Sequence, residues 1–325
     1  MSFFRNKKIL VTGAAGFVGT HLIERLVRTD ARIIGTYHTV APVFQHPAVT
    51  YLQADLTRAE DCRNAVDQAE LVFHCAAATS GAAVITASPL THVTPNIVMN
   101  ALLLNAAYGA HVHKFLWLGS STAYPSGDDH PFTEIEVMDG EPFEKYFCVG
   151  WMKRYTEVLC RTYGEKLSPP MTTIVLRPTN IYGPGDKFDP ERSHVLPALV
   201  RKVIEGNDPV EVWGTGNDVR DLIYIDDMVQ AMMRAMEKIN RYDTFNIGSG
   251  ETHSVKEILA LILKICRRTD ARIVYDPSKP STIPRREVDV SKAQQILGFK
   301  TGVGLEEGLK KTIAWYRKAS GASTS

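Results

Sequence analysis

The sequence predicts an α/β protein: a doubly wound parallel sheet followed by a smaller C-terminal lobe. Three observations predict it. Short apolar or β-branched runs alternate with helical-length segments before Pro178, a glycine-rich turn follows the first apolar run, and glycine- and proline-rich connections become frequent after Pro178. Right-handed crossovers between such strands place helices on both faces of the sheet. A chain of 325 residues suffices for one large domain or two closely associated ones.

The expected elements of the first part follow from the spacing of apolar residues. Strands are expected at 8–11, 32–37, 49–53, 71–74, 114–118 and 172–176. Helical periodicity predicts helices at 17–28, 58–68, 95–110 and 148–164. Two later helices are expected around 255–267 and 305–317.

Composition and charge exclude several classes of protein. Lys and Arg total 37 against 36 Asp and Glu, a net charge of +1, and the charges are scattered, so we expect no nucleic-acid partner. No apolar run approaches the roughly 18 residues of a membrane span, and no membrane association is expected. Five widely spaced cysteines and no Cys/His cluster predict neither a disulfide framework nor a metal site. The first residues contain no apolar signal region, so we expect a cytoplasmic protein.

The glycine-rich turn is the first candidate for ligand binding. Gly13, Gly16 and Gly19 lie between the first strand and the first helix, where a dinucleotide pyrophosphate can approach the backbone and face the helix N-terminus. A tight turn without a ligand has the same pattern, so the residues of neighbouring segments are needed to distinguish the two interpretations. At the ends of the third and fourth strands, 55–56 and 76–77 are placed where adenosine and ribose would lie. The second strand ends at His38 without the Asp or Glu that binds a ribose 2′-hydroxyl, which favours NADP with NAD as the alternative.

These positions define the expected domains. Residues 1–178 are predicted to form a dinucleotide-binding Rossmann domain, to which a segment of about 221–250 returns. Residues 179–220 and 251–318 are predicted to form a substrate-binding lobe, and the small, polar residues 319–325 a disordered tail.

Motifs along nearly the whole chain resemble the extended short-chain dehydrogenase/reductase family of nucleotide-sugar epimerases, dehydratases and reductases. Besides the glycine turn and 74–77, they are 119–125, 177–184, 220–227 and 245–248. Segments 193–199, 212–214 and 278–280 are most similar to the GDP-L-fucose synthase branch. The resemblance implies NAD(P)-dependent reduction, epimerisation or both of a nucleotide sugar, with a GDP-4-keto-6-deoxy sugar expected. It also implies a homodimer formed through the helix that carries Lys153.

The resemblance implies a reductase site with one departure. Ser120 and Lys153 match the family's hydroxyl and lysine, but Val149 stands where the family has a tyrosine four residues before the lysine. Valine cannot donate a proton. Three interpretations stay open: Ser120 and Lys153 only bind ligand, Tyr146 reaches the site from about 10 Å further along the helix axis, or a substrate hydroxyl, water or Lys153 supplies the proton.

A second departure concerns epimerisation. His194 matches the family's acid/base histidine, whereas Thr122 stands at the position of its cysteine. A threonine hydroxyl is a far weaker acid than a thiol, so His194 acting alone at one carbon, or merely binding ligand, is the alternative. Cys148 carries a thiol beside the missing tyrosine, although a structural cysteine is the simpler interpretation. Ser121 and Thr122 replace the acidic pair of the dehydratases, which argues against dehydration and decarboxylation.

The remaining predicted residues bind substrate and cofactor. Arg201, Arg220 and Lys279 match the family's diphosphate-binding cations, with Arg285 close enough to assist, and Asn180 and Trp213 would line the sugar and base pocket. Solvated charges and loop packing are the alternatives for each. The predicted cofactor-binding residues are Gly13, Gly16, Phe17, Val18, Gly19, His38, Asp55, Leu56, Ala76, Ala77 and Lys153. A catalytically impaired or non-catalytic binding protein, or an epimerase without net redox, is the alternative function.

Overall fold

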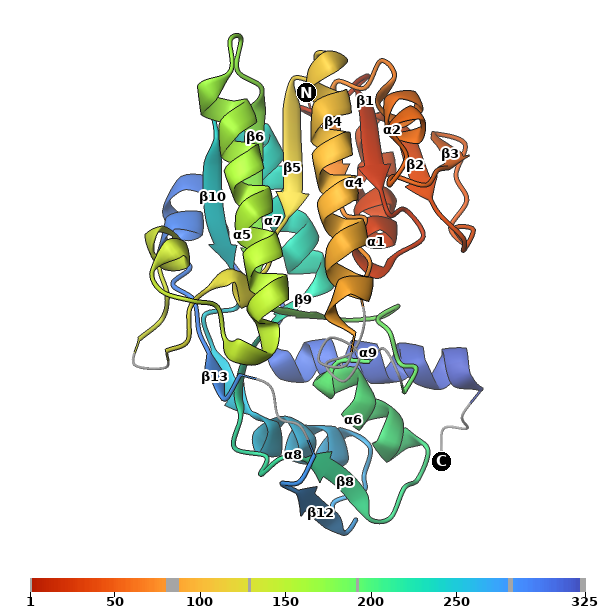
Figure 1. Ribbon diagram of the computed structural model, residues 1–325. Helices are drawn as coiled ribbons and strands as arrows, with labels where there is room; N and C mark the ends of the chain where they lie inside the picture. Colours follow the sequence, from red (N-terminus) through yellow and green to blue (C-terminus); the bar gives the residue numbers. More distant parts are fainter. Residues whose placement is uncertain (1, 80–87, 128–129, 191–192, 280–282, 322–325) are drawn as a thin grey trace.

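A computed structural model of the protein describes residues 2–79, 88–127, 130–190, 193–279 and 283–321 (Figure 1). A large parallel sheet covered by helices forms the upper part, and a smaller lobe lies beneath the carboxyl ends of its strands (Figure 1). This confirms the predicted fold class. Among the described residues, no helix is long and apolar enough to cross a membrane.

Within the described ranges, the large sheet contains seven parallel strands in the order β10-β6-β5-β4-β1-β2-β3. The six strands predicted before Pro178 are all present, and the seventh comes from later in the chain. Their bounds are β1 Lys8–Thr12, β2 Arg32–Tyr37, β3 Val49–Gln53, β4 Leu71–His74, β5 Lys114–Leu118, β6 Thr172–Pro178 and β10 Asp243–Ile247. Alternate side chains of the central strands enter two separate cores, one on each face, as the pleat requires.

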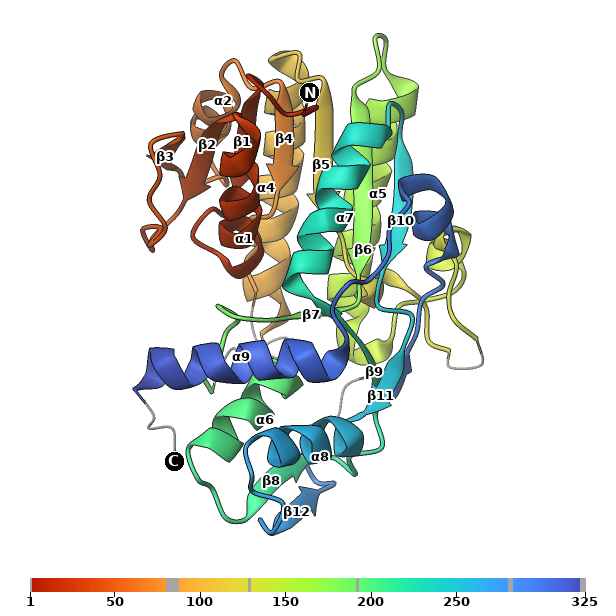
Figure 2. The same cartoon turned by 180° about the vertical axis from the view of Figure 1, so that it is seen from behind.

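Helices cover both faces of this sheet (Figures 1 and 2). On one face lie α2 (Ala59–Val66), α4 (Pro89–Gly109) and α5 (Phe147–Arg161), and on the other α1 (Phe17–Leu26) and α7 (Ile225–Lys238). The prediction that the helix after the fourth strand begins at Pro95 is wrong, because α4 starts six residues earlier and contains this proline. Pro95 has no N–H to donate to the carbonyl of Thr91, four residues earlier, and the neighbouring Asn96 Nδ2 donates to the carbonyl of His92 at 2.6 Å.

In its described residues, the smaller lobe contains two short sheets and three α-helices. One sheet joins β7 (Asn180–Tyr182), β9 (Val219–Tyr224), β11 (Thr252–Ser254) and β13 (Arg285–Arg286), and the other pairs β8 (Val210–Trp213) with β12 (Ile273–Asp276). The helices are α6 (Val195–Ile204), α8 (Val255–Ile265) and α9 (Leu305–Ser320). Since β9 belongs to this lobe, the returning segment begins at α7 rather than near residue 221.

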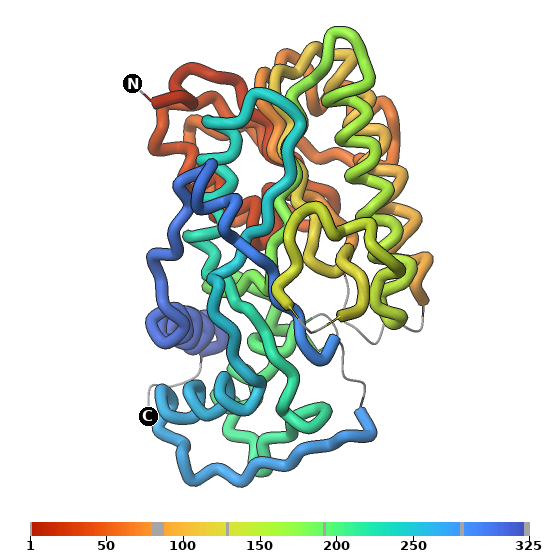
Figure 3. Tube along the Cα trace, turned by 90° about the vertical axis from the view of Figure 1, so that its left-hand side faces the viewer, coloured from red at the N-terminus to blue at the C-terminus, as the bar shows by residue number. Residues whose placement is uncertain are grey.

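The tail prediction also needs correction. Residues 319 and 320 belong to α9, which ends at Gly321, a residue with a φ of +68° that terminates the helix in the left-handed conformation. Residues 322–325 lie outside the described part. The segment after β5, yellow in Figure 3, lies beside the blue segment that follows β13, where Phe132 bridges to Val288.

Candidate active site

The glycine turn brings three backbone segments into close contact. Gly13 has a φ of +67°, and a Cβ on it would lie 2.9 Å from Cα of Ala76. A Cβ on Gly19 would lie 2.2 Å from the carbonyl oxygen of Gly13, so this helix approaches the turn only because the residue is glycine. Gly16 caps α1 without a side-chain hydrogen bond, which leaves amide groups of the first helical turn for a ligand. This bare, amide-lined turn fits a pyrophosphate.

Other predicted cofactor residues surround the turn. Phe17 and Val18 form the start of α1, and Ala77 is exposed after β4. His38 is exposed at the end of β2, and Asp55 accepts hydrogen bonds from Thr57 that lower the pKa of its carboxyl group. The side chain of Leu56 packs in the core, so only its backbone is left to face a ligand.

A buried hydrogen-bond chain connects the glycine turn to the helix of Lys153. Thr12 Oγ1 accepts from the amides of Cys75 and Ala76, so its own proton goes to His74 Nδ1 at 2.7 Å. His74 Nε2 then donates to Asn100 Oδ1 at 2.9 Å, and Asn100 Nδ2 donates to Thr156 Oγ1 at 3.1 Å. Burial lowers the pKa of His74 to about 4, so the ring is neutral in this tautomer. The sequence places His74 in a motif but does not indicate this role.

Ser120, Thr122 and Lys153 meet around the end of β5. Ser120 Oγ accepts from Thr122 N at 3.1 Å and from Thr122 Oγ1 at 2.9 Å. Lys153 Nζ donates to the carbonyl of Leu118 at 3.4 Å and lies 4.9 Å from the ring centroid of Trp117. Burial lowers the pKa of Lys153 to about 8, although the charge of Glu157 opposes the shift. The ammonium is therefore able to release its proton near neutral pH.

The residues around the missing tyrosine lie on two different elements. Val149 is in the first turn of α5 and only 4% exposed. Tyr146 precedes that helix, at the end of a 3₁₀ turn over Glu144–Tyr146, and its phenol lies near enough to the Arg220 guanidinium to influence the pKa of that arginine. The structure therefore places the Tyr146 phenol on the side of the small lobe.

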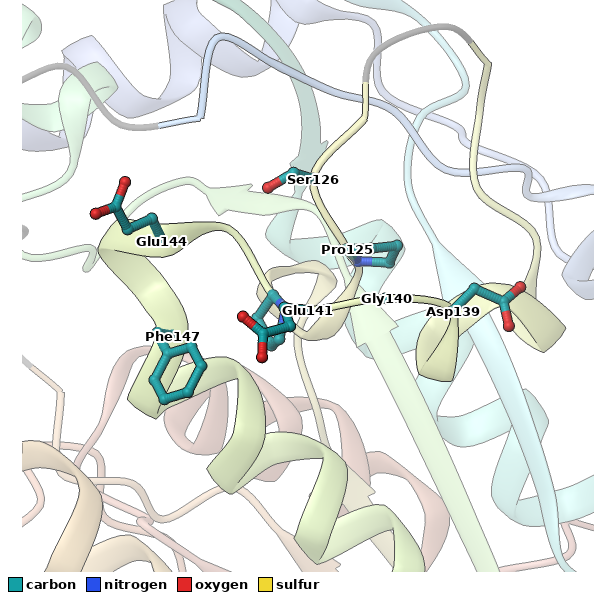
Figure 4. Close-up of a pocket in the computed structure, with 8 residues that line it drawn as sticks. Pro125, Ser126, Asp139, Gly140, Glu141, Glu144 and Phe147 are labelled. Atoms are coloured by element: carbon teal, nitrogen blue, oxygen red, sulfur yellow. The ribbon is translucent and has the colours of Figure 1, made fainter.

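A hollow of about 480 Å³ opens beside the start of α5 (Figure 4). Asp139, Glu141 and Glu144 line it together with Ser126 and Phe147, and no Lys or Arg is among the described lining residues. An acidic wall repels a diphosphate, so this hollow is not the nucleotide site.

His194 lies at the junction of the lobes, immediately before α6. Its imidazole is accessible, and the surrounding protein together with the charge of Lys187 lowers its pKa. The neighbouring Asp186 was missed by sequence reasoning. Its Oδ1 accepts from the amide of Lys187 at 2.7 Å, its buried Oδ2 has no hydrogen-bond partner in the described structure, and burial raises the pKa of this carboxyl to about 7.

The predicted substrate-binding residues divide into two groups. Trp213 ends β8 and is 47% exposed, and Lys279 Nζ lies 6.0 Å from its ring centroid, so an aromatic surface and a cation are adjacent. Asn180 instead donates to the carbonyl of Asp221 at 3.1 Å. Arg201, in the last turn of α6, pairs with Glu205 at 3.2 Å, directly after the helix, so its charge is partly engaged there.

The arginines of β9 and β13 differ in burial, which bears on the alternative that they are solvated surface charges. Arg220 is buried and donates to the carbonyls of Val219 and Ile283, and to Asp218. Arg285 points outward to Glu287 at 2.6 Å, and the next residue, Arg286, points inward because successive strand residues face opposite sides. Arg286 Nη1 donates to the carbonyl of Pro125, and its other guanidinium nitrogens have no partner within the described ranges.

Comparison with known proteins identifies the relationship. Residues 9–248 match the NAD dependent epimerase/dehydratase family. The chain belongs to this family. A probable GDP-L-fucose synthase of Oryza sativa is 32% identical, over 97% of this chain and 94% of the relative, and a dTDP-4-dehydro-6-deoxy-D-allose reductase of a Streptomyces species is 29% identical over 96% of each.

Solved structures agree with the family assignment. The UDP-glucose 4-epimerase of Thermotoga maritima superposes with a TM-score of 0.87 at 29% identity, covering 96% of this chain and 99% of the other. UDP-glucuronic acid 4-epimerase from Bacillus cereus, solved with its sugar nucleotide and NAD, gives 0.84 at 26% identity, with the same coverage. This NAD-dependent epimerase/dehydratase family member is therefore an enzyme with a nicotinamide dinucleotide cofactor, and the turn at Gly13 fits that group.

Proposed function

We propose that the enzyme reduces, epimerises or both reduces and epimerises a nucleotide-linked 4-keto-6-deoxy sugar, with GDP as the nucleotide. The names of the rice and Streptomyces relatives support this class of substrate. When bound, the cofactor supplies or accepts the hydride. Gly13, Gly16 and Gly19 would hold its pyrophosphate, and Lys153 its nicotinamide ribose.

The observation that carries the proposal is the pair of hydrogen bonds entering Ser120 Oγ. Both come from Thr122, so the lone pairs of Ser120 are engaged and its own proton is left to bind a keto oxygen. A donor in this position polarises the carbonyl and stabilises the oxyanion that forms on reduction. Thr122 thus acts through Ser120, in place of the proton transfer that a cysteine would perform.

The sequence leaves four proton sources open: Tyr146, a substrate hydroxyl, water and Lys153. We choose Lys153. Its lowered pKa allows the ammonium to protonate an alkoxide at neutral pH. Tyr146 would contact the substrate from the side of Arg220, and His194 would serve as the acid/base group for exchange at a carbon beside the ketone. Trp213 and Lys279 would bind the base and the diphosphate, with Asn180, Arg201 and Arg220 as further substrate-lobe residues.

The test is NADPH oxidation with GDP-4-keto-6-deoxymannose in heavy water, followed by proton NMR of the product. Oxidation with deuterium at the sugar carbons beside the ketone is the expected result. A Ser120→Ala/Lys153→Ala double variant that turned over like wild type would overturn the assignment of these residues. Exchange without oxidation would favour an epimerase without net redox.

A non-catalytic binding protein is the second candidate, because the position of the missing tyrosine is filled by a buried valine. Titration distinguishes the two: a binding protein would bind NADPH and the GDP-sugar but leave both unchanged.

We further propose a cytoplasmic homodimer and a preference for NADP(H). Phe147, Trp151, Tyr155 and Val158 are 42–52% exposed at helical spacing along α5, and this apolar face suits a second copy. No acidic residue ends β2, where His38 is exposed. Sedimentation at two protein concentrations tests the dimer, and titration with NADPH and NADH tests the preference.

A further inference from the structure

The loop of residues 183–187 crosses from the small lobe to the first helix of the large domain. His21 Nε2 donates to the carbonyl of Pro184 at 2.8 Å, and this histidine lies in the second turn of α1. Gly185 has a φ of +80°, and a Cβ on it would lie 3.7 Å from His21 Nε2 and 3.9 Å from the Phe17 ring. The loop therefore lies against the start of α1, as its course after β7 shows (Figure 2).

Lys187 lies at the end of this loop and contacts a second segment at the carboxyl end of the large sheet. Its ammonium donates to Thr79 Oγ1, in the segment that follows β4. That segment begins at Cys75 and Ala76, whose amides are held by Thr12 and whose backbone touches Gly13. One end of the loop is thus anchored beside the glycine turn and the other beside the segment that packs on it.

The charge of Lys187 extends over the junction of the lobes. It contributes to the lowered pKa values of His92 on α4 and of His194 before α6. Lys153, the other lysine that acts on His92, donates to the end of β5, on the other side of β4 from the glycine turn. Lys187 is the lysine that the structure anchors to the segment packed on this turn.

A pyrophosphate on the glycine turn carries negative charge that a nearby cation would neutralise. Residues 12–20 contain no Lys or Arg, so the turn itself offers amide groups and a helix dipole but no full positive charge. His21 already donates through Nε2 to Pro184, and its Nδ1 faces Glu24 at 3.5 Å. A lysine or arginine that contacts the pyrophosphate would therefore come from outside residues 12–20.

We propose that Lys187 binds the pyrophosphate of the dinucleotide cofactor, so that the small lobe contributes a cation to the cofactor site and the 183–187 loop closes over it. Thr79 positions the ammonium before the cofactor arrives and shares it afterwards. This assignment depends on the cofactor, which the family establishes, and is independent of the sugar proposed above.

The test is direct titration of the purified protein with NADPH, followed by fluorescence and without any sugar substrate. Lys187→Met is expected to weaken binding at least about tenfold, and Lys187→Arg to stay within about threefold of wild type. Lys166→Met removes an exposed lysine remote from the loop and serves as the matched control, with no change expected. The difference between wild type and Lys187→Met is expected to shrink in 1 M salt, because a phosphate contact is screened.

ADP-ribose, used as a competitor, locates the contact, because it retains the pyrophosphate but lacks the nicotinamide. Its affinity is expected to fall by the same factor as that of NADPH in Lys187→Met. A loss for NADPH alone would place Lys187 at the nicotinamide end and overturn the proposal, as would equal affinities of wild type and variant. Thr79→Val keeps the charge and removes the anchor, so it gives a second, milder loss of about threefold that does not depend on Lys187→Met folding normally.

Discussion

The hydroxyl group of Thr122 donates to Ser120 Oγ at 2.9 Å, and the backbone amide of the same threonine donates to that oxygen at 3.1 Å. A single residue thereby engages both lone pairs of the serine that faces the end of β5. Thr122 therefore orients Ser120, although its hydroxyl is too weak an acid to act as an acid/base group itself.

Removing the Thr122 hydroxyl is expected to slow reduction. Thr122→Val keeps the shape of the side chain and deletes one of the two donors, so Ser120 can rotate its proton away from the substrate. The loss of one hydrogen bond of about 1 kcal/mol predicts a roughly fivefold to tenfold lower kcat. Thr122→Ser is the control and retains the rate. Equal rates for wild type and Thr122→Val would show that the hydrogen bond does not orient Ser120.

The rate of reduction is expected to depend on the protonation of Lys153. Burial lowers its pKa to about 8, so the ammonium that donates the proton is present below that pH and is lost above it. We expect kcat/KM to be flat up to about pH 7 and to fall about tenfold per unit well above pH 8. A profile that rises through pH 8 would assign the active form to the neutral amine, and Lys153→Met is expected to abolish the pH-dependent part.

The Val149→Tyr variant tests whether a tyrosine at this position raises the rate of reduction. Val149 lies one turn before Lys153 on the same helix, so Val149→Tyr places a phenol near the ammonium. We expect a higher reductase rate than in Val149→Phe, which has the same ring without the hydroxyl. Both variants are overpacked by a similar amount, of order 1–3 kcal/mol, because the valine is 4% exposed. Equal rates for the two variants would show that the site no longer uses a tyrosine hydroxyl at this position.

Asp186 is expected to make stability fall as pH rises. Its folded-state pKa, about 7, exceeds that of an unfolded aspartate near 4, so the folded state holds the extra proton between these values. Ionisation in the folded protein then costs up to about 4 kcal/mol above pH 7. Asp186→Asn removes this cost, and urea unfolding should show about 1–3 kcal/mol of stabilisation at pH 8 relative to pH 5.

Exposed Asp270 supplies the control for that comparison. Asp270→Asn should change the free energy of unfolding equally at both pH values. Equal effects of Asp186→Asn at pH 5 and pH 8 would contradict the raised pKa.

The sequence alone determined the large sheet and the cofactor turn, since both depend on local patterns. Apolar runs of strand length identified six strands, and the glycines at 13, 16 and 19 marked a turn that a Cβ would block. Ser120 and Lys153 were found by resemblance at a fixed spacing. The start of α4 was misplaced because proline favours the first turn of a helix, whereas Pro95 lies within a helix that already begins at Pro89.

The features that only the tertiary structure decided depend on contacts between segments far apart in the sequence. Lys187 meets Thr79 across 108 residues, and Arg286 rather than Arg285 turns inward because of the pairing of a two-residue strand. The low pKa of Lys153 and the high pKa of Asp186 arise from burial, which no local pattern encodes. The pKa of each group in a site depends on how much water and which charges surround it after packing. These surroundings are fixed only when the chain has folded.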